Sequence, residues 1–158
     1  MAFFEFKNVK VAGYSAAVPK HIIKNEGDAV KFDDYTAEEF VEMTGVRQRR
    51  ISYELTSSDL CYEAAEKLIS DLSWDKSEIG VIVFVSQTPD YILPATACIL
   101  QDRLGLKKEC YATDISLGCS GWVYGLSNIV SLISTGSVKR GLLMVGDAKR
   151  RTDGPVDP

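Results

Sequence analysis

The feature that most constrains the fold of this chain is a long stretch without a charged residue, from Ile115 to Val138. About 20 apolar residues can span a bilayer, so a membrane helix has to be considered. The stretch contains six serines, four glycines and Asn128, which make it too polar for a membrane span. We therefore expect a helix, from about Cys119 to Thr135, that is buried inside protein on all sides.

Apolar runs on either side of this helix predict strands that are covered on both faces. They are 79–85, 111–116 and 141–146. A further strand is expected at 9–18, which Pro19 ends, and a short, charged strand or extended segment at 46–51. A loop is expected at 21–26. Capping residues and apolar stripes predict helices between the strands, at 36–44, 57–72 and 94–104. This alternation indicates a layered α/β domain with a mixed, mostly parallel sheet.

The composition narrows the functional classes. With 158 residues, 46% of them hydrophobic, the chain has the size of one globular domain, and its net charge of −4 argues against nucleic-acid binding. The N-terminus lacks the basic start and apolar run of a secretory signal. The four cysteines and the single histidine, His21, show no metal-ligand spacing, so a reduced, cytoplasmic protein without a metal is expected. Three of the cysteines are predicted to be core residues: Cys61, Cys98 and Cys110.

The remaining cysteine, Cys119, lies where an apolar strand should turn into a helix. The N–H groups and the dipole of a helix N-terminus favour the thiolate, which is the nucleophilic form of cysteine, and they can also stabilise an oxyanion. The alternative is that Cys119 is a small, buried apolar side chain, as most free cysteines are. Local sequence alone favours neither the nucleophile nor the buried side chain.

Two features suggest that the chain is half of a larger body. The uncharged helix needs cover on the side that would otherwise meet water, and Gly121 and Gly125, four residues apart, would permit close approach by another helix. The segment 149–158 has the composition of a loop that leads onward.

Four segments, in order, resemble the N-terminal half of β-ketoacyl-(acyl-carrier-protein) synthase III, a condensing enzyme of the thiolase fold. The segment 44–51 is similar to the family's T-G-I-x-x-R-x-I, and 86–98 to its S-P-D-Y-x-x-P-x-x-A loop and helix. The segment 114–121 resembles the nucleophile segment D-x-x-x-x-C-x-G, and 135–146 resembles the S-G-x-x-x-x-x-L-x-V-G stretch that follows. The resemblance implies that residues 1–158 are the N-terminal half of a thiolase-like enzyme.

The resemblance also implies a reaction. Cys119 would take an acyl group from acyl-CoA, and its own N–H would be one oxyanion donor. The acyl-enzyme would then be attacked by a carbanion from decarboxylated malonyl-acyl carrier protein. The family's histidine and asparagine for decarboxylation come from the C-terminal half, and His21 aligns elsewhere, so this chain alone should be inactive in condensation. A homodimer without prosthetic group is implied, with no nucleic-acid or membrane partner.

Some positions bear on the substrate. Thr44 would line the CoA channel or simply end its helix, while Glu39 and Met43 stand where the family often has a tryptophan and an arginine that sandwich the CoA adenine. A donor on another carrier, or a secondary-metabolite role, is therefore plausible. Leu93 falls where many members have a phenylalanine that reaches into the neighbouring subunit's acyl pocket, and this smaller residue suggests a longer or branched acyl group.

Alternatives remain open within and outside the superfamily. Hydroxymethylglutaryl-CoA synthase or a polyketide-type synthase is the nearest rival, and a noncatalytic subunit of a heterodimeric synthase is a different class that Cys119 disfavours. Basic residues could contact an acidic carrier protein, although such runs are usually solvated surface. They are Arg47, Arg49, Arg50, Lys139, Arg140, Lys149, Arg150 and Arg151.

Overall fold

The computed structural model describes residues 3–26 and 35–148, which form two units. The first unit comprises the described residues up to Ala17 together with Thr56–Asp147, and the second contains the described residues between Val18 and Leu55 together with Ala148. The C-terminal segment predicted as a loop, with the basic residues 149–151, lies outside the described residues.

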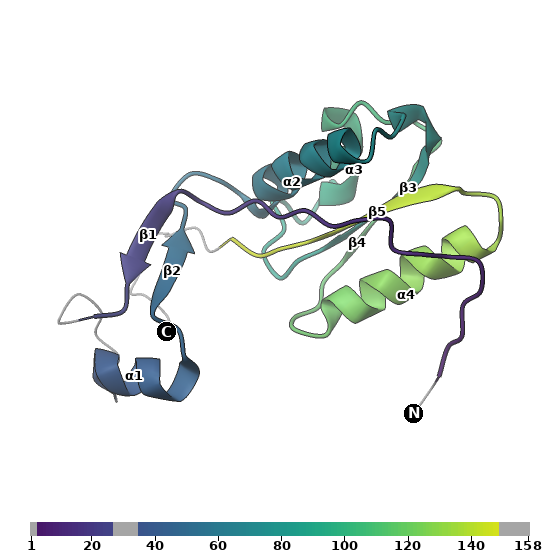
Figure 1. Cartoon of the computed structure of the whole chain (residues 1–158). Coiled ribbons are helices and arrows are strands. Elements are labelled where there is room, and N and C mark those ends of the chain that lie inside the picture. The colour runs from purple at the N-terminus through teal and green to yellow at the C-terminus, as the bar shows by residue number, and fades with distance from the viewer. Residues whose placement is uncertain (1–2, 27–34, 149–158) are drawn as a thin grey trace. The chain divides into compact units, whose positions relative to one another are not determined.

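The first unit is built on a three-stranded parallel sheet in the order β4-β3-β5 (Figure 1). The strands are β3 (Ile79–Val85), β4 (Tyr111–Ile115) and β5 (Arg140–Val145). Val81 of the central strand is in register with Tyr111 on one side and with Gly141 on the other. The sheet therefore matches the apolar runs from which strands were predicted.

Helices cover both faces of this sheet (Figure 1). They are α2 (Ser57–Asp71), α3 (Thr96–Arg103) and α4 (Gly121–Ser134), with a short 3-10 turn at Lys76–Glu78 before β3. Side chains of β3 alternate between two cores: Ile82 and Phe84 pack with α2 and α3, whereas Val81, Val83 and Val85 pack with α4. The prediction of a layered α/β fold is confirmed.

The helix α4 differs from the expectation of burial on all sides. Gly121, Gly125 and Ile129 form its buried face, whereas Trp122 and Tyr124 are 54% and 60% exposed. The sequence led us to expect that Gly121 and Gly125 permit close approach by another helix. Among the described residues, side chains of β3 and β5 approach them instead, namely Val85 and Leu143. Within the described residues, no helix is both long enough and apolar enough to cross a membrane.

The prediction of a strand at 9–18 is wrong, because the structure has no strand at these residues. Within the first unit these residues form no ladder with a neighbouring strand, and an added Cβ on Gly13 would contact Leu68 of α2 and Leu72, the C-cap of that helix. A strand requires a hydrogen-bonded partner, and among the described strands β5 pairs with β3 alone. The alternation of apolar residues at 9–18 is typical of a strand, but no described strand lies beside this segment to pair with it.

The second unit pairs two short antiparallel strands, β1 (His21–Lys24) and β2 (Gln48–Ile51), and carries one helix, α1 (Ala37–Thr44). The loop predicted at 21–26 is therefore partly a strand. Thr36 and Glu39 form the predicted capping box, and Gly45 ends the helix in the left-handed region at φ 73°.

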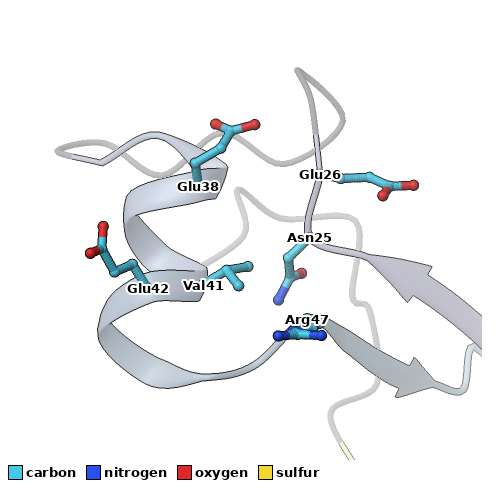
Figure 2. Close-up of a pocket in the computed structure, with 6 residues that line it drawn as sticks. All are labelled: Asn25, Glu26, Glu38, Val41, Glu42 and Arg47. Carbon is cyan, nitrogen blue, oxygen red and sulfur yellow. The ribbon is translucent and has the colours of Figure 1, made fainter.

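A cavity of about 380 Å³ lies beside α1 in this unit. Its lining residues are Asn25, Glu26, Glu38, Val41, Glu42 and Arg47 (Figure 2). The carboxylates of Glu38 and Glu42 point away from Asn25 and do not converge on a common centre.

Candidate active site

Cys119 lies in the turn that connects β4 to α4. The N–H of Gly121 donates to the carbonyl of Gly118 over 2.7 Å, and Ser120 is the N-cap of the helix. The helix therefore begins two residues later than predicted, and Cys119 precedes its cap. The thiol is exposed. It lies beyond the carboxyl ends of parallel strands, the edge at which α/β proteins bind their ligands.

The backbone around the thiol has unused hydrogen-bond donors. Within the described part of the chain, no acceptor takes the N–H of Cys119, Ser120 or Trp122. The first turn of α4 holds no acidic residue and has no side-chain cap. The positive end of the helix is thus available to an anion or a polarised carbonyl next to the sulfur.

Asp114 connects the nucleophile segment to α3. Its carboxylate accepts the N–H groups of Thr96 and Ala97 over 2.6 and 2.7 Å, at a helix start whose own cap residue, Ala95, offers no side-chain acceptor. An acidic partner at a helix N-terminus is stabilising, and each charge-assisted bond is stronger than a neutral one. Asp114 therefore fixes the end of the loop 86–95 to the strand that leads to Cys119.

Asp147 fixes the beginning of the same loop. Its Oδ1 accepts from the hydroxyl of Ser86 at 2.9 Å and from the N–H of Gln87 at 2.6 Å, with a longer contact to the N–H of Thr88. Sequence reasoning missed this role of Asp147. The only signal was an acidic residue directly after a buried strand, which does not identify its partners.

Leu93 lies on an exposed apolar loop tip. Leu93 is 81% exposed, and its neighbours Tyr91 and Ile92 are 62% and 95% exposed. Within this chain the loop places Leu93 in solvent rather than against the core. Its predicted role toward an acyl group stays a prediction.

Thr44 belongs to the second unit, whereas Cys119 and Leu93 belong to the first. The Thr44 hydroxyl donates to the carbonyl of Phe40 at 2.7 Å and accepts the N–H of Val46 at 3.2 Å. These bonds end the helix α1, which was one of the two roles foreseen for this residue. Neither bond bears on the other role, in the CoA channel.

The other cysteines divide into buried and exposed. Cys61 and Cys110 are buried as predicted, and burial raises the pKa of their thiols to about 12 and about 11, with Asp90 and Asp147 adding to the effect at Cys61. Cys98 was predicted to be a core residue and is exposed. The helix α3 turns Ala97 and Leu100 inward, which leaves Cys98 on its outer side. No group of three metal-ligating side chains exists among residues 3–26 and 35–148.

No family model matches the chain, but comparisons with individual proteins find relatives of one kind. Over 141 residues the chain is 35% identical to β-ketoacyl-(acyl-carrier-protein) synthase III of Clostridium perfringens strain SM101, covering 87% of this chain and 42% of that protein. The synthase III of Streptococcus agalactiae is 36% identical over 136 residues, covering 85% of this chain and 41% of that protein.

Solved structures give the same result. The crystal structure of 3-oxoacyl-(acyl-carrier-protein) synthase from Burkholderia xenovorans LB400 superposes with a TM-score of 0.76 at 41% identity, covering 82% of this chain and 38% of that one. The chain spans less than half the length of the relatives it matches. It is thus a homologue of part of β-ketoacyl-(acyl-carrier-protein) synthase III and has the thiolase fold of these condensing enzymes.

Proposed function

We propose that this chain is the part of a condensing enzyme that carries the acyl group, on Cys119. The observation that supports this proposal most strongly is the position of the thiol. It is exposed in the turn before α4, beyond the carboxyl end of a parallel strand, and its own N–H is unpaired among the described residues. A nucleophile and an oxyanion donor therefore belong to the same residue.

The first step is a thioester exchange. The Cys119 sulfur, having lost its proton, attacks the carbonyl carbon of a donor thioester, and the oxyanion that forms is stabilised by the Cys119 N–H. The bond between the carbonyl carbon and the donor sulfur breaks, and the donor leaves as a thiolate that takes up the proton. A thiolate suits this step because it is both a good nucleophile and a good leaving group.

The second step is a decarboxylative condensation. Malonyl-acyl carrier protein loses its carboxylate as CO2, and the carbanion left behind attacks the Cys119 thioester. A carbon–carbon bond forms, the bond to the Cys119 sulfur breaks, and 3-oxoacyl-acyl carrier protein is released. The reaction needs no prosthetic group. We further propose that residues 1–158 act as the N-terminal half of a homodimeric cytoplasmic enzyme, in which Leu93 contacts the acyl group and Thr44 the donor.

The chain by itself should not complete the second step. Its single histidine, His21, lies on β1 in the second unit, and the resemblance places the decarboxylating histidine and asparagine outside these residues. Acyl transfer to Cys119 and condensation are therefore separable.

The test is a donor panel. The protein is incubated with acetyl-CoA, longer and branched acyl-CoA and acyl-acyl carrier protein, and the peptide that contains Cys119 is analysed by mass spectrometry beside a Cys119→Ser control. The proposal predicts a mass increase equal to the acyl group with at least one donor. The absence of an adduct with every donor would overturn it and would favour a noncatalytic subunit.

A further inference from the structure

We infer that Gln87, which the sequence did not single out, is a substrate-contacting residue: its carboxamide donates a hydrogen bond to the carbonyl of the acyl thioester at Cys119. This inference rests on the proposed function and deepens it. Two loops approach each other closely at the carboxyl edge of the sheet.

The carboxamide of Gln87 lies against Gly118, the residue directly before Cys119. A Cβ added to Gly118 would be 3.2 Å from Nε2, 3.3 Å from Cδ and 3.4 Å from Oε1 of Gln87. The nitrogen, carbon and oxygen of the carboxamide therefore all lie close to this glycine. They can do so because residue 118 has no side chain. The amide is held one residue away from the sulfur-bearing residue.

The backbone that carries Gln87 is fixed. Its N–H donates to Asp147 over 2.6 Å, and the preceding residue, Ser86, donates its N–H to the carbonyl of Ile115 over 3.2 Å. The second bond extends the β3–β4 pairing by one residue toward the Cys119 turn. Both loops therefore share one rigid frame, and preorganised donors of this kind favour a charge that develops on a substrate carbonyl.

The Gln87 carboxamide also has no hydrogen-bond partner among the described residues. Gln87 is exposed, and within the described residues its Nε2 and Oε1 have no hydrogen-bond partner. Gln101 differs from Gln87 in this respect, because its Nε2 donates hydrogen bonds to the backbone carbonyls of Lys107 and Cys110. The Gln87 carboxamide lies against Gly118, next in sequence to Cys119 and its unpaired backbone N–H, so it can offer a thioester carbonyl a second donor.

The test compares acyl transfer with a thiol reaction that involves no carbonyl. Gln87→Met keeps the length of the side chain over Gly118 and removes the donor, and Gln101→Met is the matched control. Acyl transfer to Cys119 is followed with the small thioester S-acetyl-N-acetylcysteamine. The thiol reaction is followed with methyl methanethiosulfonate, which converts the thiol to a mixed disulfide.

We expect Gln87→Met to slow acyl transfer by about two- to tenfold, the fold-change that corresponds to one neutral hydrogen bond. The methanethiosulfonate rate should stay unchanged. Equal slowing of both reactions would show that Gln87 only shapes the turn, and an unchanged acyl-transfer rate would show that it makes no contact; either result overturns the inference. Failure of the unsubstituted protein to be acylated would instead contradict the proposed function, and the inference with it.

Discussion

Replacing Gly125 by alanine tests how closely α4 is packed on the sheet. A Cβ at this position would lie 2.6 Å from Cδ1 of Leu143 and 2.7 Å from Cγ2 of Val85. Carbon atoms in contact are normally about 3.5 to 4.0 Å apart, so either the helix or these side chains must move by about 1 Å. Val85 is only 1% exposed, and the close packing of protein interiors opposes a shift of this size.

Two terms of opposite sign determine the effect of Gly125→Ala on the free energy of unfolding. Alanine is favoured over glycine in a helix by about 1 kcal/mol, whereas overpacking a core costs about 1 to 3 kcal/mol. Because the clash involves two side chains at once, we expect a net loss of about 1 to 2 kcal/mol. In a protein of this size that lowers Tm by about 2 to 8 °C.

Urea unfolding followed by circular dichroism measures this change. Gly146→Ala, just after β5, is the control for the packing term alone, since its added Cβ would be 3.6 Å from Sγ of Cys61, an ordinary contact. The reasoning is refuted if Gly125→Ala is more stable than the unsubstituted protein by about 1 kcal/mol, because helix propensity would then act alone.

Three further predictions concern pH, capping and association. Burial raises the pKa of Cys61 from 9.0 to about 12, so its neutral thiol stabilises the fold fully below pH 9 and this contribution is lost as the pH rises toward 12. The urea midpoint should therefore fall less steeply between pH 8 and pH 11 for Cys61→Ala than for the unsubstituted protein. Identical slopes of midpoint against pH for the two proteins would contradict this prediction. Asp114→Asn should cost about 1 to 2 kcal/mol, because it removes the charge that caps α3, and a urea midpoint equal to that of the unsubstituted protein would count against this cap. The chain alone should associate through the exposed apolar residues in the first turn of α4, so light scattering should show a dimer or larger species that Trp122→Ser with Tyr124→Ser weakens. A clean monomer without substitutions would contradict this prediction.

Local signals accounted for most of the fold. The apolar run 79–85 became the central strand, and Thr36 with Glu39 formed the expected capping box. These features depend on residues close together in the chain, so the sequence contains the whole signal. The position of Cys119 before a helix was predicted for the same reason, because strand, glycine turn and apolar helix follow one another directly.

Features that depend on distant partners could not be predicted. Asp114 caps a helix that begins 18 residues earlier, and Asp147 orders a loop 59 to 61 residues away. Neither pairing has a local pattern. The error at Cys98 has a related cause. The apolar residues of α3 are the consecutive run 97–100, and such a run goes once around an eight-residue helix without showing which side it buries.

The central claim, that Cys119 is the acyl acceptor, is tested most directly by the stoichiometry of acyl incorporation. Cys98 is the other exposed cysteine among the described residues and serves as the internal control. Protein, Cys119→Ser and Cys98→Ser are treated with the same thioester donor, and intact masses are recorded before and after neutral hydroxylamine, which cleaves thioesters. We expect about one hydroxylamine-sensitive acyl group per chain in the protein and in Cys98→Ser, and none in Cys119→Ser. Incorporation that survives in Cys119→Ser, or that disappears in Cys98→Ser, would contradict the claim.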